Sequence, residues 1–170
     1  MPRFQPEEML RRLEGQGVRY VVIGGVGATL HGSPLPTRDA DLCPAGDVPN
    51  LDSLATALRE MGARIRTSDA AEGLPFSCDA VFLRQMKLLN LITRFGDLDL
   101  SFEPSGTAGY EDLSARAVVY DLGEGLHVRV ASLEDIIRSK EAANREKDRQ
   151  VLPTLRLLLE RIRKEDPGAR

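Results

Sequence analysis

The pattern of apolar positions predicts that strands dominate the first two thirds of the chain. Residues 18–24, VRYVVIG, form a continuous apolar run rich in β-branched side chains, which is typical of a buried strand. A second strand is predicted over 38–43, where Asp-Ala-Asp-Leu alternates between polar and apolar. Further strands are expected at 63–67, at 88–93 and 98–102 around a tight Phe95-Gly96-Asp97 turn, and in a hairpin of 117–120 with 126–130.

Helical spacing is found at both ends of the chain and between the strands. It predicts a helix that starts near Pro6, a short one over 25–31 and one over 51–61. Two helices close the chain, one capped by Ser132 and one over about 147–164. The last helix carries an apolar stripe, and Pro153 within it predicts a late start or a kink.

The order of elements predicts an α+β (α/β) fold, with a small mixed sheet flanked by helices and followed by C-terminal helices. We expect a single domain over 1–170, with a sheet-containing core over about 1–130, helices over 131–164 and a disordered tail over 165–170.

Composition narrows the class of protein. With 170 residues, of which 42% are hydrophobic, the chain is long enough for one normal core, and its net charge of −3 excludes a generally basic nucleic-acid coat. Cys43 and Cys78 form no CxxC pair, so reduced thiols are the simpler interpretation. The N-terminus has no apolar signal segment and no run could span a bilayer, so we expect a cytoplasmic protein without a membrane partner.

Two Asp-x-Asp pairs stand on predicted strands. Alternation places Thr37, Asp39 and Asp41 on one face, and it places Asp97 and Asp99 on one face of the later strand. If these strands are neighbours, three or four carboxylates converge, which is costly unless divalent cations neutralise them. Oxygen ligands suit Mg²⁺ or Mn²⁺, and a pair of such ions is a known device for phosphoryl or nucleotidyl transfer.

Gly24 and Gly25 lie between a predicted strand and a predicted helix. Backbone N–H groups without side chains can approach phosphate oxygens there, and a helix N-terminus favours anions. A tight strand-to-helix turn is the simpler explanation for such a pair alone, and a surface turn or calcium loop explains an isolated Asp-x-Asp. The combination is more specific than either motif, and it favours a nucleotide site.

The glycine pair, thirteen residues and then Asp39-Ala40-Asp41-Leu42 resemble the motifs of the DNA polymerase β-type nucleotidyltransferase superfamily. The sequence around these motifs is similar to that of the small AbiEii/MenT-like nucleotidyltransferases, many of which are toxins of bacterial toxin–antitoxin pairs. The resemblance covers residues 17–160, and it rests on RYVVIGGVGATLHGSPLPTRDADL, LITRFGDLDLSFEPSGTAGYEDL and VASLEDIIRSKEAANREKDRQVLPTL. Gly25 departs from it, since many members have Ser there. Because the chain is short, we also expect it to have no large C-terminal substrate domain.

The resemblance implies a Mg²⁺-dependent enzyme that moves NMP from an NTP to a hydroxyl and releases pyrophosphate. It makes Asp39 and Asp41 catalytic metal ligands, with Asp99 as the third acid and Asp97, in the turn, as second choice. It further implies the 3′ end of tRNA as acceptor, a cognate antitoxin as partner, and Thr37 as the hydroxyl that the antitoxin can phosphorylate. Alternatives are a small molecule such as an aminoglycoside or a protein hydroxyl as acceptor, or a catalytically silent nucleotide-binding module.

A lysine stands on the apolar stripe of the penultimate helix. Lys140 follows Ile136 and Ile137 at helical spacing, and Asp148 faces inward from the last helix. One interpretation is a salt bridge between the helices, or a lysine that snorkels to solvent. The other is that Lys140 contacts the triphosphate and Asp148 orients it, which the family's Lys…Arg-x-Lys-Asp run favours. Arg38 is a further candidate for phosphate contact.

Basic residues are frequent on the last two helices. They form either a modest patch for an RNA backbone or ordinary alternating charge on exposed helix faces. The residues concerned are Arg138, Arg145, Lys147, Arg149, Arg156, Arg161, Arg163 and Lys164.

Overall fold

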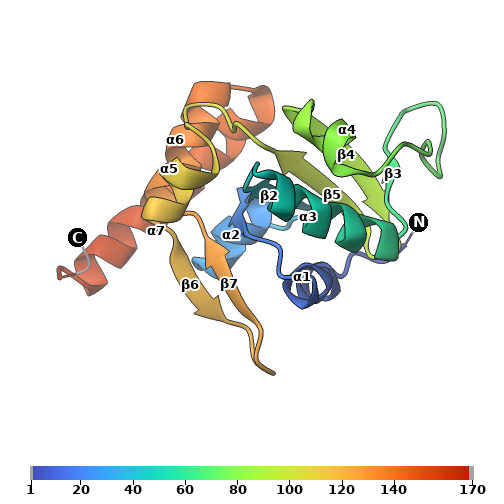
Figure 1. Cartoon of the computed structure of the whole chain (residues 1–170). Helices are drawn as coiled ribbons and strands as arrows, with labels where there is room; N and C mark the ends of the chain where they lie inside the picture. Colours follow the sequence, from blue (N-terminus) through green and yellow to red (C-terminus); the bar gives the residue numbers. More distant parts are fainter. Residues whose placement is uncertain (1, 169–170) are drawn as a thin grey trace.

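The computed structural model describes residues 2–168, and its strands form one mixed sheet in the order β3-β4-β5-β2-β1-β7-β6. Figure 1 shows the β6–β7 hairpin projecting from one end of this sheet. The strands are β1 (Tyr20–Ile23), β2 (Asp39–Pro44), β3 (Arg64–Ile65), β4 (Leu88–Thr93), β5 (Gly96–Ser101), β6 (Val118–Asp121) and β7 (His127–Val130).

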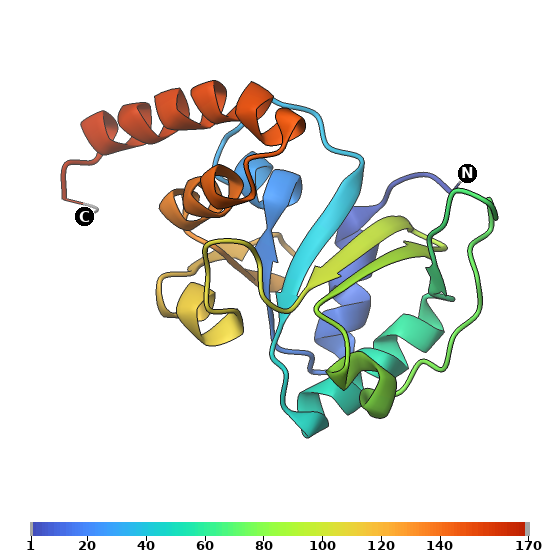
Figure 2. The same cartoon turned by 90° about the horizontal axis from the view of Figure 1, so that it is seen from above.

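Helices cover both faces of the sheet. Seen from above, α1, α3 and α4 lie on one side of it, and α2, α6 and α7 lie on the other (Figure 2). The helices are α1 (Pro6–Gly15), α2 (Gly24–Leu30), α3 (Val48–Glu60), α4 (Ala80–Arg84), α5 (Tyr110–Ala115), α6 (Leu133–Ala143) and α7 (Glu146–Glu165). The α+β class, with its flanked mixed sheet and C-terminal helices, is thereby confirmed.

The two acidic strands are neighbours at the centre of the sheet. β2 pairs in parallel with β5, and the register sets Asp39 opposite Asp97 and Asp41 opposite Asp99. The condition for the carboxylates to converge is therefore met. β2 also pairs with β1 antiparallel, which brings Ile23, the residue before the glycine pair, opposite Asp41.

The predicted turn around Gly96 is wrong by two residues. β5 begins at Gly96, so the connection from β4 is Arg94-Phe95, and Asp97 lies within the strand rather than in the turn. Gly96 takes a φ of 109°, and Thr93 closes the turn because its hydroxyl donates to the Gly96 carbonyl at 2.8 Å. The turn chemistry therefore rests on Thr93 as well as on the glycine.

Two cores form because side chains alternate along β2 and β5. Ala40, Leu42, Leu98 and Leu100 are buried in the core that also holds α1, α3 and α4. Cys43 lies on the opposite face, in a second core shared with α2, α5, α6 and α7. The aspartates point toward this second face, at the edge of its core rather than within it.

Three helix boundaries differ from the sequence pattern. α3 begins at Val48, three residues before the predicted start, because the Asp47 carboxylate caps it through the Asn50 N–H. α4 and α5 were not predicted, since each is short. α7 begins at Glu146 and runs through Pro153, so a late start is wrong. It ends at Glu165, inside the tail expected to be disordered, whose residues 169 and 170 lie outside the described residues.

Candidate active site

Three carboxylates converge on one face of the central strands. Asp39, Asp41 and Asp99 each offer one oxygen, and these oxygens all lie within 4.8 Å of one another. Three oxygen donors without sulfur or imidazole suit a hard cation such as Mg²⁺ or Mn²⁺. Asp97 stands outside this triad, and its side chain is 40% exposed. The convergence that strand alternation predicted is thus present, with Asp99 rather than Asp97 as its third member.

The triad is electrostatically unfavourable without a counter-charge. Burial, together with the charges of Asp39 and Asp99, raises the pKa of Asp41 to about 7. Burial also raises the pKa of Asp99 to about 6, although the Arg66 guanidinium works in the opposite direction. A divalent cation would stabilise the ionised carboxylates, so the donor set and its electrostatics both fit such an ion.

Gly24 and Gly25 bring the start of α2 against the acidic strand. Gly24 has a φ of +63°, and a Cβ there would fall on the Asp41 carboxylate. A Cβ on Gly25 would stand 2.6 Å from the Thr37 hydroxyl oxygen. Both glycines therefore have a packing reason, which agrees with the simpler explanation of a tight turn. Contact with phosphate stays a prediction.

Thr37 fills the space that a side chain at position 25 would need. Its hydroxyl donates to the Asp39 carbonyl at 3.1 Å, which fixes it beside the first triad strand. A serine at position 25 would collide with this hydroxyl. In this chain Thr37 therefore brings a hydroxyl close to where that serine would stand.

Lys140 and Asp148 meet between the last two helices. The Lys140 ammonium lies 3.8 Å from an Asp148 carboxylate oxygen, and Asp148 is 1% exposed. Asp148 is held more closely by Arg145, whose guanidinium donates to it at 2.7 and 3.2 Å and whose backbone N–H donates at 3.1 Å. The predicted interhelical bridge is present, and Asp148 also caps α7. A role for either residue in nucleotide binding stays a prediction.

A cleft of about 690 Å³ joins these groups. It is lined by the glycine pair, the triad, and residues from the α6–α7 junction and from β4 and β5. The positive charges of Lys140 and Lys147 reach Asp41 and partly offset the rise in its pKa. Thr37, the exposed Arg38 and Asp148 line the same cleft. The residues proposed from the sequence for metal and nucleotide binding thus surround one cavity, with the exception of Asp97, the second choice for the third acid.

Sequence reasoning missed Arg66, which enters the site from the end of β3. One guanidinium nitrogen lies 2.9 Å from Asp97, and the other donates to Asp99 at 2.8 Å. A strand was predicted over 63–67, but the sequence does not show which strands it neighbours, and the observed β3 ends at Ile65, one residue before Arg66. The only hint in the sequence is the Asp97-Leu98-Asp99 motif, because two carboxylates on the same face of a strand favour a cation close to them.

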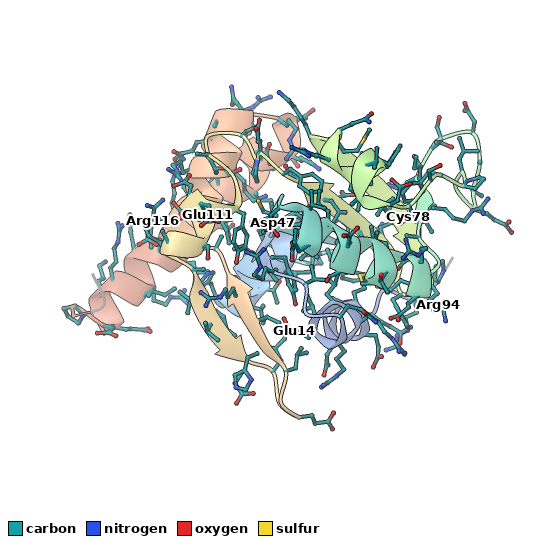
Figure 3. The ribbon with its side chains drawn as sticks, viewed as in Figure 1. Glu14, Asp47, Cys78, Arg94, Glu111 and Arg116 are labelled. Atoms are coloured by element: carbon teal, nitrogen blue, oxygen red, sulfur yellow. The ribbon has the colours of Figure 1, made fainter. Side chains whose placement is uncertain are left out.

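Sequence reasoning also missed a second ion-pair cluster on the cleft wall. Asp135, 3% exposed, accepts from Arg116 at 2.7 Å and lies 3.1 Å from Arg138. Arg116 is labelled at the end of α5 in Figure 3, and Asp112 of the same helix joins the pair. The cluster fixes α5 against the first turn of α6, one turn before Lys140.

The basic residues of the last two helices are partly neutralised within the chain. Four of the eight, Arg138, Arg145, Arg156 and Arg163, form ion pairs with acids. His31, by contrast, is a packing residue. Its ring bonds the Ala131 carbonyl at 2.7 Å and the Tyr120 hydroxyl at 2.8 Å, which ties α2 to the β6–β7 hairpin.

Comparison with known proteins identifies the fold. No protein-family model matches the chain, and no curated protein matches its sequence. Among solved structures, a lincosamide antibiotic adenylyltransferase, LnuA, bound to lincomycin, aligns with a TM-score of 0.60 and 15% identity over 92% of this chain and 99% of its own. A candidate nucleotidyltransferase from Thermotoga maritima aligns with a TM-score of 0.54 and 18% identity, over 94% of this chain and 97% of its own.

The chain therefore has the polymerase β-type nucleotidyltransferase fold. At these identities the likeness establishes the fold, and the narrower resemblance to AbiEii/MenT-like toxins stays a prediction. No helix among residues 2–168 is long and apolar enough to cross a bilayer.

Proposed function

We propose that the protein is a nucleotidyltransferase that uses an NTP and a divalent cation to transfer NMP to a hydroxyl. The observation that carries this proposal is the Asp39–Asp41–Asp99 triad on adjacent parallel strands, within 4.8 Å and beside a cation-lined cleft. The nucleotidyltransferase fold of the whole chain supports it. A catalytically silent module would have no need to keep three mutually repelling carboxylates at the centre of the sheet.

The proposed roles of the cleft residues follow from their charges. Asp39, Asp41 and Asp99 would hold Mg²⁺ or Mn²⁺, which supplies charge neutralisation and orients the attacking and leaving oxygens. Lys140, from the α6–α7 side, faces the triad and is placed to bind the triphosphate as pyrophosphate leaves. Arg38 adds a second cation at the exposed rim of the same cleft. Gly24 and Gly25 keep side chains out of the space between α2 and β2.

Two acceptors are supported by different observations. The sequence resemblance to toxin nucleotidyltransferases favours the 3′ end of tRNA, with an antitoxin as partner and Thr37 as its target. A small hydroxyl compound is favoured by the fold likeness to an enzyme that modifies an antibiotic, which spans 92% of the chain. The pairing of four basic residues with acids of the chain also favours the small compound, because it leaves less free positive charge for RNA.

The direct test is transfer of label from each α-labelled NTP in the presence of Mg²⁺. One arm contains total RNA, and the other contains lincosamides, aminoglycosides and other small hydroxyl compounds. Label on RNA, with growth arrest on expression, would support the toxin function. Label on a drug, with resistance on expression, would support the small-molecule function. No transfer to any acceptor, and no pyrophosphate release, would contradict the proposal.

We expect Asp41→Asn to abolish transfer while the fold remains intact. The change removes a triad ligand at constant size and relieves repulsion, so the melting temperature should hold or rise. Asp52→Asn, a similar change of charge at an exposed position of α3, is the matched control and should keep full activity. Unchanged transfer by Asp41→Asn would contradict the metal site.

A further inference from the structure

The Arg66 guanidinium bridges two carboxylates of β5, and only one of them belongs to the triad. One nitrogen lies 2.9 Å from Asp97 Oδ2, and the other donates to Asp99 Oδ1 at 2.8 Å. Residues two apart on a strand point to the same face, and the planar fork of a guanidinium can engage a separate carboxylate with each arm. Arg66 therefore connects a triad ligand with an acid that the triad does not use.

The backbone of Arg66 is fixed by a hydrogen bond, while its side chain contacts two carboxylates at once. Its N–H donates to the Asn90 carbonyl at 2.9 Å, and Asn90 pairs with Asp99 across β4 and β5. The side chain thus crosses β4 to reach β5. The directed hydrogen bond goes to Asp99, whereas the nitrogen facing Asp97 is buried and makes no directed bond. The contact with Asp97 is therefore an ion pair without a directed hydrogen bond, and a rotation of the guanidinium could add that bond.

Arg66 and a divalent cation compete for the same carboxylate. Asp99 must share or give up its bond to the arginine when it ligates a cation, and two positive groups on one carboxylate repel each other. Asp97 offers the arginine a second anion on the same strand and outside the triad. Its side chain is 40% exposed, so its own desolvation cost is small.

We propose that Arg66 is an internal counter-cation, which bonds Asp99 before a divalent ion binds and moves fully onto Asp97 when the ion occupies the triad. Asp97 then binds the Arg66 guanidinium. Asp97 therefore has a function although it is not a ligand of the metal ion. Arg66 is a positioning residue that sets the metal affinity through Asp99. The inference rests on the proposed metal-dependent function of the triad.

The test is the affinity for Mn²⁺ alone, measured on the full chain by the electron paramagnetic resonance signal of free Mn²⁺ and by calorimetry. Arg66→Gln should bind Mn²⁺ about tenfold more tightly or better, because a charge-assisted bond no longer has to be displaced. Asp97→Asn should bind Mn²⁺ several-fold more weakly, because Arg66 then rests on Asp99 alone. In an Arg66→Gln background, Asp97→Asn should change the affinity by less than about twofold.

The double variant separates the proposal from simple charge effects. If Asp97 acts only through its own negative charge, its replacement weakens Mn²⁺ binding equally in both backgrounds, and the proposal is overturned. Equal or weaker binding by Arg66→Gln overturns it as well. Arg66→Met, which removes the charge and keeps an unbranched side chain, provides a second reading should Arg66→Gln unfold, and it should also bind Mn²⁺ more tightly than the wild type.

Two further measurements locate the cause of a failure. Arg94→Gln removes an equal charge at the β4–β5 turn (Arg94 is labelled in Figure 3), and it should leave Mn²⁺ affinity unchanged. The Arg94 guanidinium lies over the Phe95 ring. Mn²⁺ binding to the triad should be present in the wild type and lost in Asp41→Asn. If the wild type shows no such binding, the proposed function fails together with this inference. If that binding and nucleotide transfer are present but Arg66→Gln does not tighten the ion, only the role of Arg66 is wrong.

Discussion

Single residues in this chain owe their places to strand alternation and to close packing. Alternation alone put Asp39 and Asp41 on one face, and the structure brings them to Asp99 within 4.8 Å. The position of Thr37 is not explained by strand alternation alone. Its hydroxyl occupies the space beside Gly25 and is bonded to the Asp39 carbonyl, so its position depends on a loop that carries no periodic pattern.

Thr37 provides a test of how close this loop lies to the chemistry. We expect Thr37→Glu to lose transfer activity, because a fourth carboxylate beside the triad repels the triphosphate and competes for the divalent cation. Thr37→Ser keeps the hydroxyl and should keep activity, and Thr37→Val shows whether the hydroxyl itself contributes. The measurement is nucleotide transfer at saturating and limiting NTP. Full activity of Thr37→Glu would place Thr37 outside the nucleotide pocket.

Arg66 marks the limit of residue-level prediction from this sequence. The acids were found because two Asp-x-Asp motifs repeat a pattern that strands impose. Arg66 follows a strand of two residues, and its side chain reaches over β4 to β5. Such a contact depends on the order of the strands in the sheet. A single sequence leaves that order open, so the cation that completes the site could not be named.

At the scale of elements, long regular segments were predicted well, and the two shortest helices were not predicted. The strands β1, β2, β4 and β5 and the helices α1, α3, α6 and α7 lie in stretches whose apolar pattern runs over several residues. The helices α4 and α5 have five and six residues, too few to show a period. The start of α3 was missed because its first turn, after the Asp47 cap, holds Pro49 and an exposed Val48 that does not belong to the buried stripe.

The α6–α7 junction allows the two roles of its ion pair to be separated. We expect Lys140→Ala to weaken NTP binding by about 1.5–3 kcal/mol, the value of a charge-assisted contact, with little change in melting temperature. Stability should hold because Arg145 rather than Lys140 is the close partner of Asp148. The measurements are NTP affinity by calorimetry and thermal unfolding of the free protein.

Asp148→Ala should give the opposite result. Losing the carboxylate that caps α7 should cost about 1–2 kcal/mol of stability and lower the melting temperature. Arg156→Ala is the matched control, because Arg156 also lies on α7 and forms an exposed ion pair with Glu141 of α6. It should have little effect on NTP affinity or on the melting temperature. If Lys140→Ala instead lowered the melting temperature and left NTP affinity unchanged, the lysine would be a structural bridge and not a nucleotide ligand.

At the scale of the whole molecule, the triad should link the stability of the fold to pH and to divalent cations. The pKa of Asp41 is about 7 in the folded chain against an ordinary value of 3.8, and that of Asp99 is about 6. Both carboxyls keep a proton on folding that the unfolded chain has already lost. Their contribution to stability is therefore complete below about pH 4 and is lost as the pH rises through about 7. The acids with lowered pKa, which are Asp47, Asp112 and Asp148, act in the opposite direction, because their contribution is lost as the pH falls through their folded-state pKa values.

The triad can be isolated by comparing the wild type with Asp41→Asn in the presence of a chelator. The variant should gain stability over the wild type as the pH rises from about 5 to about 8, reaching on the order of 2 kcal/mol, because it has no charge to bury. Adding Mg²⁺ should raise the melting temperature of the wild type, and more at the higher pH, because the ligands must be ionised to bind it. The same addition should leave Asp41→Asn nearly unchanged. A difference between the two proteins that stays constant with pH, or a Mg²⁺ effect of equal size in both, would show that the carboxylates do not titrate as a buried metal site.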